Sequence, residues 1–393
     1  MIRINSKLLV RVLGDLRRAL GIAKSSHHPV SITAERGSIT VRMNTADSAV
    51  SCQVVAGNCT PQSVLLPVSV FAAVQPSARQ DLTISIDGEC ATIESCNAAG
   101  VRSTVTEKCV VHTPTDSPVR ASEPGWRISN PSRLGRVLQQ AASISDPTSA
   151  RYSLGCIRLR GSDGQVSATD GRQVLAASGF ALPVDEVMIP GAVLAKASFL
   201  ADCSSISDGR STDSVSIACA NGALRWQIDC KIQTAGRFPN IDMCIPRPES
   251  SRTVVTVSDA DAEYLIDHLD RLLGKPQELT ATTLDLTIDR ATCKRLVHLR
   301  TRRIEFDMAS VVEVTLDGST FDAAPMRVGM DHHLLLNALR FGHRRIHLQS
   351  PTGPVFCHDR SSDFVWALMH ESLTIGPTPT MQTISTPQTL VAA

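Results

Sequence analysis

The chain has 393 residues and a formal net charge of +1 at pH 7; 42% of its residues are hydrophobic and 20% are charged. This composition excludes a disordered or fibrous protein, and about two to four domains are expected at this length. The small net charge excludes an overall attraction to nucleic acid or membrane, so any basic surface must come from local clustering.

No stretch of the sequence is long and apolar enough to cross a bilayer, and the first residues do not form a signal peptide, because Arg and Asp interrupt their apolar positions. We therefore expect a cytoplasmic protein. Its twelve cysteines are scattered, with no Cys-x-x-Cys pair, and are expected to be reduced and mostly buried. The alternative is a zinc site that joins Cys357 and His358 to a distant pair, but we expect no metal and no other cofactor.

Units of one helix with strands recur along the chain. The predicted helices cover residues 6–20, 71–74, 130–144, 190–201, 258–273 and 331–341. Alternating apolar positions near each helix predict strands, for example 30–33 and 39–42 after the first. In the third unit, Asp170-Gly171 predicts a hairpin turn between strands 166–169 and 174–177.

Six units in one order predict an α+β protein with three domains of two units each. The expected boundaries are 1–117, 125–246 and 250–373, and residues 374–393, rich in Pro and Thr, are expected to form a flexible tail. Three unrelated α+β domains are the alternative, which the repeated order makes less attractive.

Three segments carry a resemblance to a known family. They are Arg151–Gly155 (RYSLG) followed by Ala168–Arg172 (ATDGR), Gly236–Asn240 (GRFPN) followed by Ile245-Pro246, and Ser350–Val355 (SPTGPV). With these segments the sequence resembles the bacterial sliding clamp, the beta subunit of DNA polymerase III, whereas residues 252–321 match it poorly beyond their helix.

The resemblance implies three clamp-type domains per chain and a head-to-tail homodimer that closes into a ring around duplex DNA. Such a protein is not an enzyme: it is a processivity factor that tethers the replicative DNA polymerase and other DNA-processing enzymes. Its implied partners are duplex DNA and three kinds of protein that bind through short peptide motifs: the polymerase, the clamp loader and repair enzymes. No membrane partner is implied.

A ring holds DNA topologically, so a few basic side chains are enough. The positions that the resemblance places against DNA are Lys24, Ser69, Thr148, Tyr152 and Ser153, and the first and third helices add Arg11, Arg17 and Arg136. An ordinary solvated helix face is the alternative for these charges. The fifth helix is acidic, with Asp259, Asp261, Glu263, Asp267 and Asp270, which argues against a uniformly basic channel.

The resemblance also implies a groove for partner peptides between the second and third domains. It carries over onto Leu154, Thr169, Gly171, Arg172, Val174, Pro239, Met243, Cys244, Ala367, Met369, His370, Glu371, Ser372 and Leu373. Apolar side chains suit such a groove because their burial anchors a peptide, although core packing would use them equally well. The family typically ends in Met-Pro-Met-Arg-Leu, whereas residues 369–373 read Met-His-Glu-Ser-Leu, which predicts altered partner specificity.

Leu272 and Leu273 resemble apolar positions at the family's dimer contact, and the domain core is their alternative role. Two other functions compete with the clamp. A divergent paralogue would keep the ring but lose standard polymerase binding. An enzyme would recruit His332, His333, His343 and His347 or a cysteine, but no set of nucleophile, base and orienting group is recognisable.

Overall fold

The computed structural model describes residues 1–56, 59–74, 80–97, 99–112, 126–127, 131–208, 213–273, 282–305, 308–358, 362–366 and 381–385. The chain divides into two compact units. Unit 1 contains Met1–Asp170 and Ser178–Phe238, and unit 2 contains Gly171–Ala177 and Pro239–Ala393. Among the described residues, no helix has the length and apolar character that a membrane span needs.

The first part of unit 1 surrounds one long helix. Its elements are β1 (Ile2–Asn5), α1 (Ser6–Leu20), β2 (Pro29–Glu35), β3 (Ser38–Asn44), β4 (Ser48–Val55), β5 (Gln62–Pro67), a 3₁₀ helix (Val68–Ala73), β6 (Asp81–Asp87), β7 (Cys90–Cys96), β8 (Arg102–Lys108) and β9 (Val110–His112). The side chain of Asn5 accepts the Leu8 N–H and begins α1, and Gly21 ends it with a φ of +70°. Leu9, Val12 and Leu16 are fully buried on one face of α1.

The second part of unit 1 repeats this combination of helices and strands. Its elements are β10 (Trp126–Arg127), α2 (Pro131–Ile144), a 3₁₀ helix (Tyr152–Gly155), β11 (Cys156–Arg160), β12 (Gln165–Thr169), β14 (Glu186–Pro190), α3 (Gly191–Ala195), a 3₁₀ helix (Ser198–Asp202), β15 (Cys203–Asp208), β16 (Ser214–Asn221) and β17 (Leu224–Lys231). A nine-stranded sheet in the order β10-β15-β16-β17-β4-β3-β2-β5-β9 spans both parts, because β17 pairs antiparallel with β4. Strands β1-β6-β7-β8 form a separate sheet, and β14-β11-β12 are neighbours in another.

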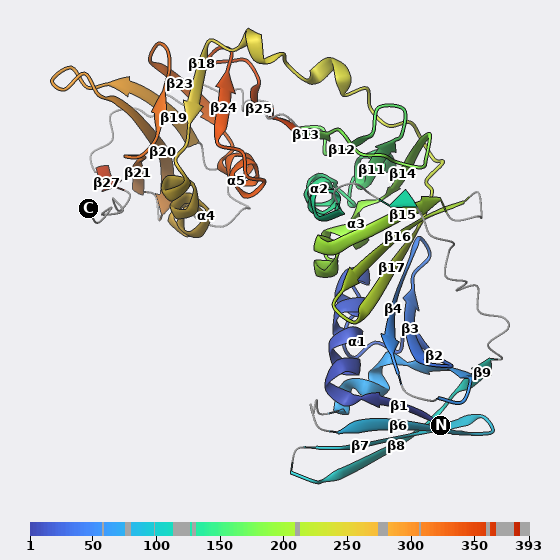
Figure 1. The fold of residues 1–393 in the computed structure, drawn as a ribbon. Helices are drawn as coiled ribbons and strands as arrows, with labels where there is room; N and C mark the ends of the chain where they lie inside the picture. The colour runs from blue at the N-terminus through green and yellow to red at the C-terminus, as the bar shows by residue number, and fades with distance from the viewer. Residues whose placement is uncertain are drawn as a thin grey trace. The chain divides into compact units, whose positions relative to one another are not determined.

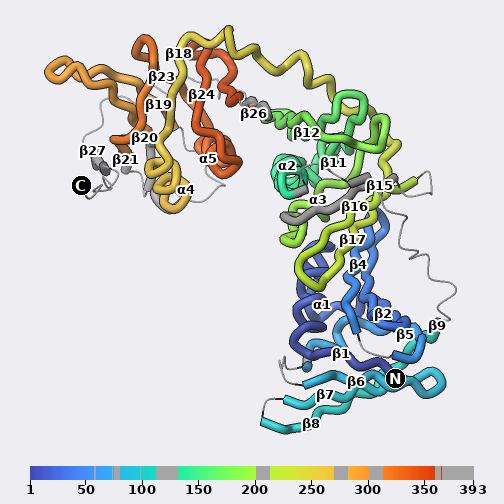
Figure 2. Tube along the Cα trace, viewed as in Figure 1, coloured from blue at the N-terminus to red at the C-terminus, as the bar shows by residue number. Residues whose placement is uncertain are grey.

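The helices of unit 1 lie in a row. α1 packs on β3 and β4, α2 packs on β12 and β15, and α3 contacts both α1 and α2. Figure 1 shows α2, α3 and α1 following one another along one side of the strands, and the tube in Figure 2 traces the same row. The three helices of unit 1 therefore share one surface, so a ligand that contacts one of them can also contact the others.

In its described residues, unit 2 contains two α-helices and strands from two sheets. Its elements are β13 (Gln173–Ala177), 3₁₀ helices at Asp242–Cys244 and Pro248–Ser250, β18 (Thr253–Thr256), α4 (Asp259–Leu273), β19 (Thr282–Ile288), β20 (Arg295–Glu305), β21 (Met308–Thr315), β22 (Thr320–Phe321), β23 (Met326–Met330), α5 (His332–Arg340), β24 (Arg345–Leu348), β25 (Val355–His358), β26 (Ser362–Trp366) and β27 (Met381–Ser385). One run of strands is ordered β13-β26-β25-β24-β18-β22, and the other is β23-β19-β20-β21-β27. α4 lies beside α5.

The described elements confirm most of the predicted helices and turns, with two differences in the helices. The predicted helix 190–201 is divided into α3 and the 3₁₀ helix Ser198–Asp202, in which Phe199 stacks on Trp226 with ring centroids 4.2 Å apart. We attribute the break to this aromatic pair, because its burial is worth more than continuing a short helix. The helix predicted at 71–74 is a 3₁₀ helix that begins at Val68.

Two further predictions concern turns and the C-terminal segment. Gly171 in the predicted hairpin has a φ of +91°, a conformation that strongly favours glycine. The segment 374–393, for which the sequence predicts a flexible tail, contains a strand, β27, that pairs with β21. Asn130, where the predicted helix 130–144 begins, lies outside the described residues, as do residues 118–124 between the first two expected domains.

Candidate nucleic-acid interface

The exposed face of α1 is basic. Lys7, Arg11 and Arg18 are exposed, and their spacing of four and seven residues puts them on one side of the helix, opposite the buried leucines. Arg18 also donates to Asp15, which is the only acidic residue of α1 and is 8% exposed. Arg17 is half-buried, so of the two predicted α1 contacts Arg11 is the better exposed.

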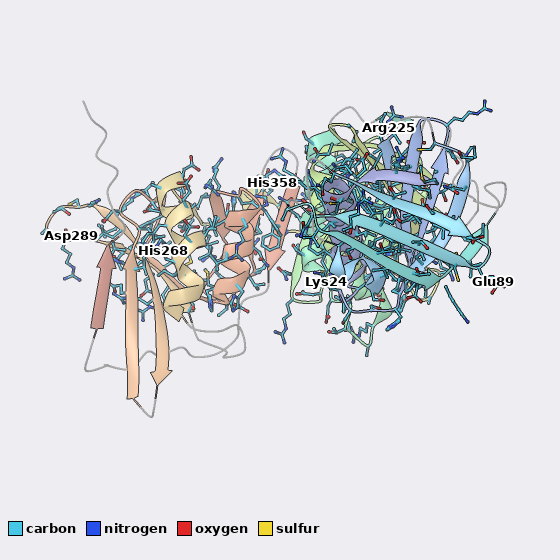
Figure 3. The ribbon with its side chains drawn as sticks, turned by 90° about the horizontal axis from the view of Figure 1, so that it is seen from below. Lys24, Glu89, Arg225, His268, Asp289 and His358 are labelled. Carbon is cyan, nitrogen blue, oxygen red and sulfur yellow. The ribbon has the colours of Figure 1, made fainter. Side chains whose placement is uncertain are left out.

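The basic face continues beyond the end of α1. Lys24, a predicted DNA contact, is exposed in the loop after Gly21 and is labelled in Figure 3. Lys196 follows α3 and is also exposed, and its Nζ lies 3.6 Å from the point that a Cβ at Gly21 would occupy. Lys196 is not among the contacts predicted from the sequence, because only the packing of α3 against α1 brings it to this surface.

α2 contributes one exposed cation and one that packs against the protein. Arg136 is exposed, as its predicted role requires. Arg133 donates to the carbonyl oxygen of Ser178 at 2.7 Å and lies 4.4 Å above the ring of Phe180, so it has a structural role. Together α1, α2 and α3 carry six Lys or Arg residues and one acid, which makes this helical surface locally positive although the whole chain is nearly neutral.

The uncharged predicted contacts are near the ends of these elements. Tyr152 is 51% exposed and Thr148 is exposed, whereas Ser69 and Ser153 are half-buried. The Thr148 hydroxyl donates to Asp146 Oδ1 at 2.6 Å, and its backbone N–H donates to the same oxygen at 2.9 Å. These bonds stabilise the carboxylate and lower the pKa of Asp146. Asp146 therefore places a negative charge beside Thr148.

The acidic helix α4 of unit 2 has a different surface. Asp261 is 2% exposed and accepts hydrogen bonds from the Gly318 N–H at 3.0 Å and the Ser319 hydroxyl at 2.6 Å, so it holds the fold together. Asp259 is paired with Arg344 at 2.7 Å. Glu263 and Asp267 remain exposed one and two turns further on, and His268 is labelled on this helix in Figure 3. The side chain of Asp270 lies outside the described residues.

The predicted peptide contacts fall on both units. Unit 1 holds Leu154 and Thr169, which are 7% and 3% exposed. Unit 2 holds exposed Gly171, Arg172, Met243 and Cys244 and the half-buried Val174 and Pro239. Ala367, Met369, His370, Glu371, Ser372 and Leu373 lie outside the described residues. The groove therefore stays a prediction.

The predicted dimer contacts, Leu272 and Leu273, form the last residues of α4, and their side chains lie outside the described residues. Their assignment to a dimer interface therefore also stays a prediction.

The histidines of the competing enzyme hypothesis are mostly packed in unit 2. His347 stacks on Phe356 and makes a 3.1 Å hydrogen bond with Ser251, and burial lowers its pKa. His343 stacks on Phe364. Possible ligand atoms of Asp331, His332 and His333 lie within 4.8 Å of one another at the start of α5, where the positive end of the helix dipole disfavours a cation.

All eleven cysteines whose side chains the structure describes are free thiols, and the prediction that most are buried holds for six of them; Cys59 and Cys96 are half-buried, and Cys90, Cys244 and Cys293 are exposed. Cys52, Cys109, Cys156, Cys219, Cys230 and Cys357 are buried. Burial raises the pKa of Cys52 and Cys230 to about 12 and that of Cys156 to about 11, so these thiols stay protonated and unreactive. Cys357 and His358 are neighbours in β25 and point to opposite faces, which argues against a shared zinc ion.

Comparisons with known proteins identify the fold. No protein-family model and no curated protein matches the sequence. Among solved structures, the chain is similar to the DnaN sliding clamp (DNA polymerase III subunit beta) of Pseudomonas aeruginosa bound to griselimycin, with a TM-score of 0.69 and 16% identity over 94% of this chain and 99% of that one. The beta subunit from DNA polymerase of Streptococcus pyogenes gives a TM-score of 0.69 and 15% identity at the same coverage of both chains.

A third solved structure, the DNA polymerase sliding clamp of Bacillus subtilis, gives a TM-score of 0.67 and 15% identity over 94% of this chain and 99% of that one. Both units of the chain are therefore included in the match. The chain has the mixed α and β fold of the bacterial sliding clamps, which the resemblance of a few short segments predicted.

Proposed function

We propose that the chain is a DNA sliding clamp: a non-catalytic, cytoplasmic processivity factor that encircles duplex DNA and tethers the replicative polymerase and other DNA-processing enzymes. The observation that carries this proposal is the likeness to solved bacterial clamps over 94% of the chain and 99% of theirs. A match of this extent means that the entire folded body is shared, which a grafted DNA-binding module would not produce.

The strand order supports a ring of two copies. In chain order the strands form six groups of three: β2 to β4, β6 to β8, β11 to β13, β15 to β17, β19 to β21 and β24 to β26. Two antiparallel pairs, β4 with β17 and β13 with β26, join the last strands of four groups. The last strands of the other two groups are β8 and β21. In a head-to-tail homodimer, β8 of each copy would pair with β21 of the other, and three clamp domains per chain would follow each other around the ring.

The basic helical surface of unit 1 supports a role in holding DNA. Clustered Lys and Arg attract phosphate without reading sequence, as a sliding protein requires. We propose that Lys7, Arg11, Arg18, Lys24, Arg136 and Lys196 line the hole and that Tyr152 and Thr148 contact the backbone. Most of these cations lie on long exposed side chains, so contacts with successive phosphates can form and break.

The proposed partners bind through short peptides at the groove inferred from the resemblance. The altered ending Met369–Leu373 leaves open a divergent paralogue with weakened polymerase binding, for which neither unit gives separate support. Binding of a labelled peptide from the tail of the same organism's replicative polymerase discriminates the working clamp from the paralogue. Binding in the micromolar range, about 8 kcal/mol, supports the working clamp. If neither the protein nor Glu371→Met binds that peptide, the paralogue becomes the better hypothesis.

The ring itself is tested by topology. The protein is loaded onto nicked circular DNA with the clamp loader of the same organism, and the complex is isolated by gel filtration at high salt. We expect the protein to stay on the circle and to be lost when a restriction enzyme linearises the DNA, while native mass spectrometry gives a dimer. Equal retention on circular and linear DNA would sink the proposal.

A further inference from the structure

The outer edge of β21 is covered by a strand from the C-terminal segment. β27 pairs with β21 in parallel, and the register joins Val311 through Thr315 to Met381 through Ser385. β27 follows β26 in the chain after residues 367–380. The edge of β21 is therefore occupied in the single chain, and this occupant is not one of the six groups of strands that build the rest of the fold.

An ion-pair network fixes β21 to the neighbouring strands of its sheet. Arg300 on β20 pairs with Asp285 on β19 at 2.8 Å and also donates to Glu313 on β21. Arg327 on β23 donates twice to Asp285, at 2.6 and 2.9 Å. Asp285 and Glu313 are 1% and 5% exposed, whereas the side chains of Arg300 and Arg327 are 27% and 53% exposed. The ion-pair network with these two buried carboxylates ties four neighbouring strands together. We therefore expect the edge of β21 to keep its position whichever strand binds there.

The same edge is required for the proposed ring, on which this inference rests. β8 is the last strand in the sheet order β1-β6-β7-β8, and its seven residues are close in number to the eight of β21. One strand edge offers a single row of N–H and C=O groups, so it accepts one partner at a time. We propose that β27 and β8 of a second copy compete for the edge of β21, and that β27 is a built-in competitor of ring closure.

The two partners differ in how they gain affinity. β27 has five residues and pairs in parallel, which is the weaker arrangement per residue, but it belongs to the same chain, where effective concentrations are on the order of millimolar. β8 offers a longer antiparallel pair but must come from solution. β27 therefore holds the edge in dilute protein, and a second copy displaces it as the concentration rises.

The size of the effect follows from the fraction of chains whose β21 edge is open. The apparent dissociation constant is the intrinsic one divided by that fraction. If the edge is open in about one chain in ten, the apparent affinity of one β8–β21 contact falls about tenfold. A ring closed by two such contacts then dimerises about a hundredfold more weakly.

The experiment replaces two adjacent residues of β27 by proline. Successive N–H groups of a strand point to opposite sides, so one of the two at Gln382 and Thr383 points toward β21. Gln382→Pro with Thr383→Pro therefore removes at least one hydrogen bond to β21. The chain supplies a matched control, because Gln388-Thr389 repeats the same dipeptide after β27. Sedimentation velocity across concentrations measures the dimer, and hydrogen exchange of residues 311–315 in dilute protein measures occupancy of the edge.

We expect the β27 variant to dimerise at least about tenfold more tightly than the natural chain and to exchange faster at β21 when dilute. The variant Gln388→Pro with Thr389→Pro should match the natural chain in both. Equal dimerisation by all three proteins would overturn the competition while leaving the ring proposal intact. Weaker dimerisation of the β27 variant would make the strand part of the interface. If none of the three dimerises, the ring fails together with the competition.

Discussion

Helices α1 and α4 have the same length, fifteen residues each, and opposite surfaces. Each buries one apolar face in its own unit, with Leu9, Val12 and Leu16 on α1 and Leu265 and Leu269 on α4. The exposed face of α1 carries Lys7, Arg11 and Arg18, whereas that of α4 carries Asp259, Glu263 and Asp267. Packing therefore constrains only the buried face of such a helix, and the charge of the other face is available for function.

Part of the acidity of α4 has a structural explanation. Asp259 and Asp261 lie in its first turn, where the helix dipole favours negative charge, and Ser258 Oγ accepts the Asp261 N–H at 3.1 Å. Glu263 and Asp267 have no such explanation. In the proposed ring they would make the wall formed by unit 2 repel phosphate, so that DNA would be held mainly by the wall of unit 1.

The largest expected effect concerns the C-terminal ends of the two helices. Leu272→Ala with Leu273→Ala should convert the proposed dimer into folded monomers at low micromolar concentration, because truncating a leucine at a buried apolar interface would cost about 2–5 kcal/mol. Leu20→Ala, at the end of α1, is the matched control and should stay dimeric. Sedimentation equilibrium measures both, and a double variant that remains dimeric would show that these leucines are not at the interface.

The basic face of α1 is tested next, by charge reversal. Lys7→Glu with Arg11→Glu should weaken binding to short duplex DNA by about a hundredfold at low salt and lower the salt slope by about two units, since two phosphate contacts are lost. Arg36→Glu with Arg225→Glu changes charge equally at exposed positions outside the helices and should have a much smaller effect. Fluorescence anisotropy over a series of salt concentrations gives both quantities. If both variants lose DNA affinity equally, binding depends on the net charge of the protein and not on the basic face of α1.

The same change on α4 should act in the opposite direction. Glu263→Lys with Asp267→Lys should tighten binding by about tenfold for every duplex sequence, because two repulsive charges become attractive. Asp242→Lys with Glu249→Lys, exposed in the 3₁₀ segments of unit 2, is the control. If the α4 variant behaves like this control, α4 does not face DNA and the two helices do not share one channel.

A smaller effect compares a contact predicted from the sequence with one that the structure adds. Lys24→Ala and Lys196→Ala should each weaken DNA binding a few-fold, uniformly across sequences, and lower the salt slope by about one unit. An unchanged slope for Lys196→Ala would mean that its proximity to α1 has no part in binding. A strong preference of either protein for one duplex sequence would count against a sliding ring.

Sequence reasoning was accurate where information is local. α1 was predicted residue for residue, because its apolar spacing lies within the helix and its caps, Asn5 and Gly21, directly adjoin it. It failed where distant segments meet. Lys196 reaches the basic surface only through the packing of α3 on α1, and β27 is a strand only because β21 offers it an edge. The burial of Asp261, which looked like a channel charge, depends on Gly318 and Ser319 more than fifty residues away.

The smallest expected effect concerns Asp146, the carboxylate that accepts two hydrogen bonds from the predicted DNA contact Thr148. The Thr148 hydroxyl lowers the pKa of Asp146, and in unit 2 the Thr292 hydroxyl does the same for Asp289 at 2.5 Å. A lowered pKa stabilises the fold above the unfolded pKa, and that contribution is lost as the pH falls through the folded value. Thr148→Val should raise the pKa of Asp146 only in part, because the backbone N–H bond remains, and Thr292→Val should raise only that of Asp289.

Carboxyl-detected NMR titration measures both pKa values. The functional difference appears when each variant is titrated with DNA near pH 4, where a raised pKa protonates part of the carboxylate. Thr148→Val should then bind DNA slightly more tightly than the natural chain, since a repulsive charge on the basic surface is partly removed, and Thr292→Val should not. The lost hydroxyl should cost little binding, because its one proton is already donated to Asp146. If both variants tighten binding equally, or neither does, Asp146 does not face DNA. The DNA-binding surface of unit 1 would then not include Thr148.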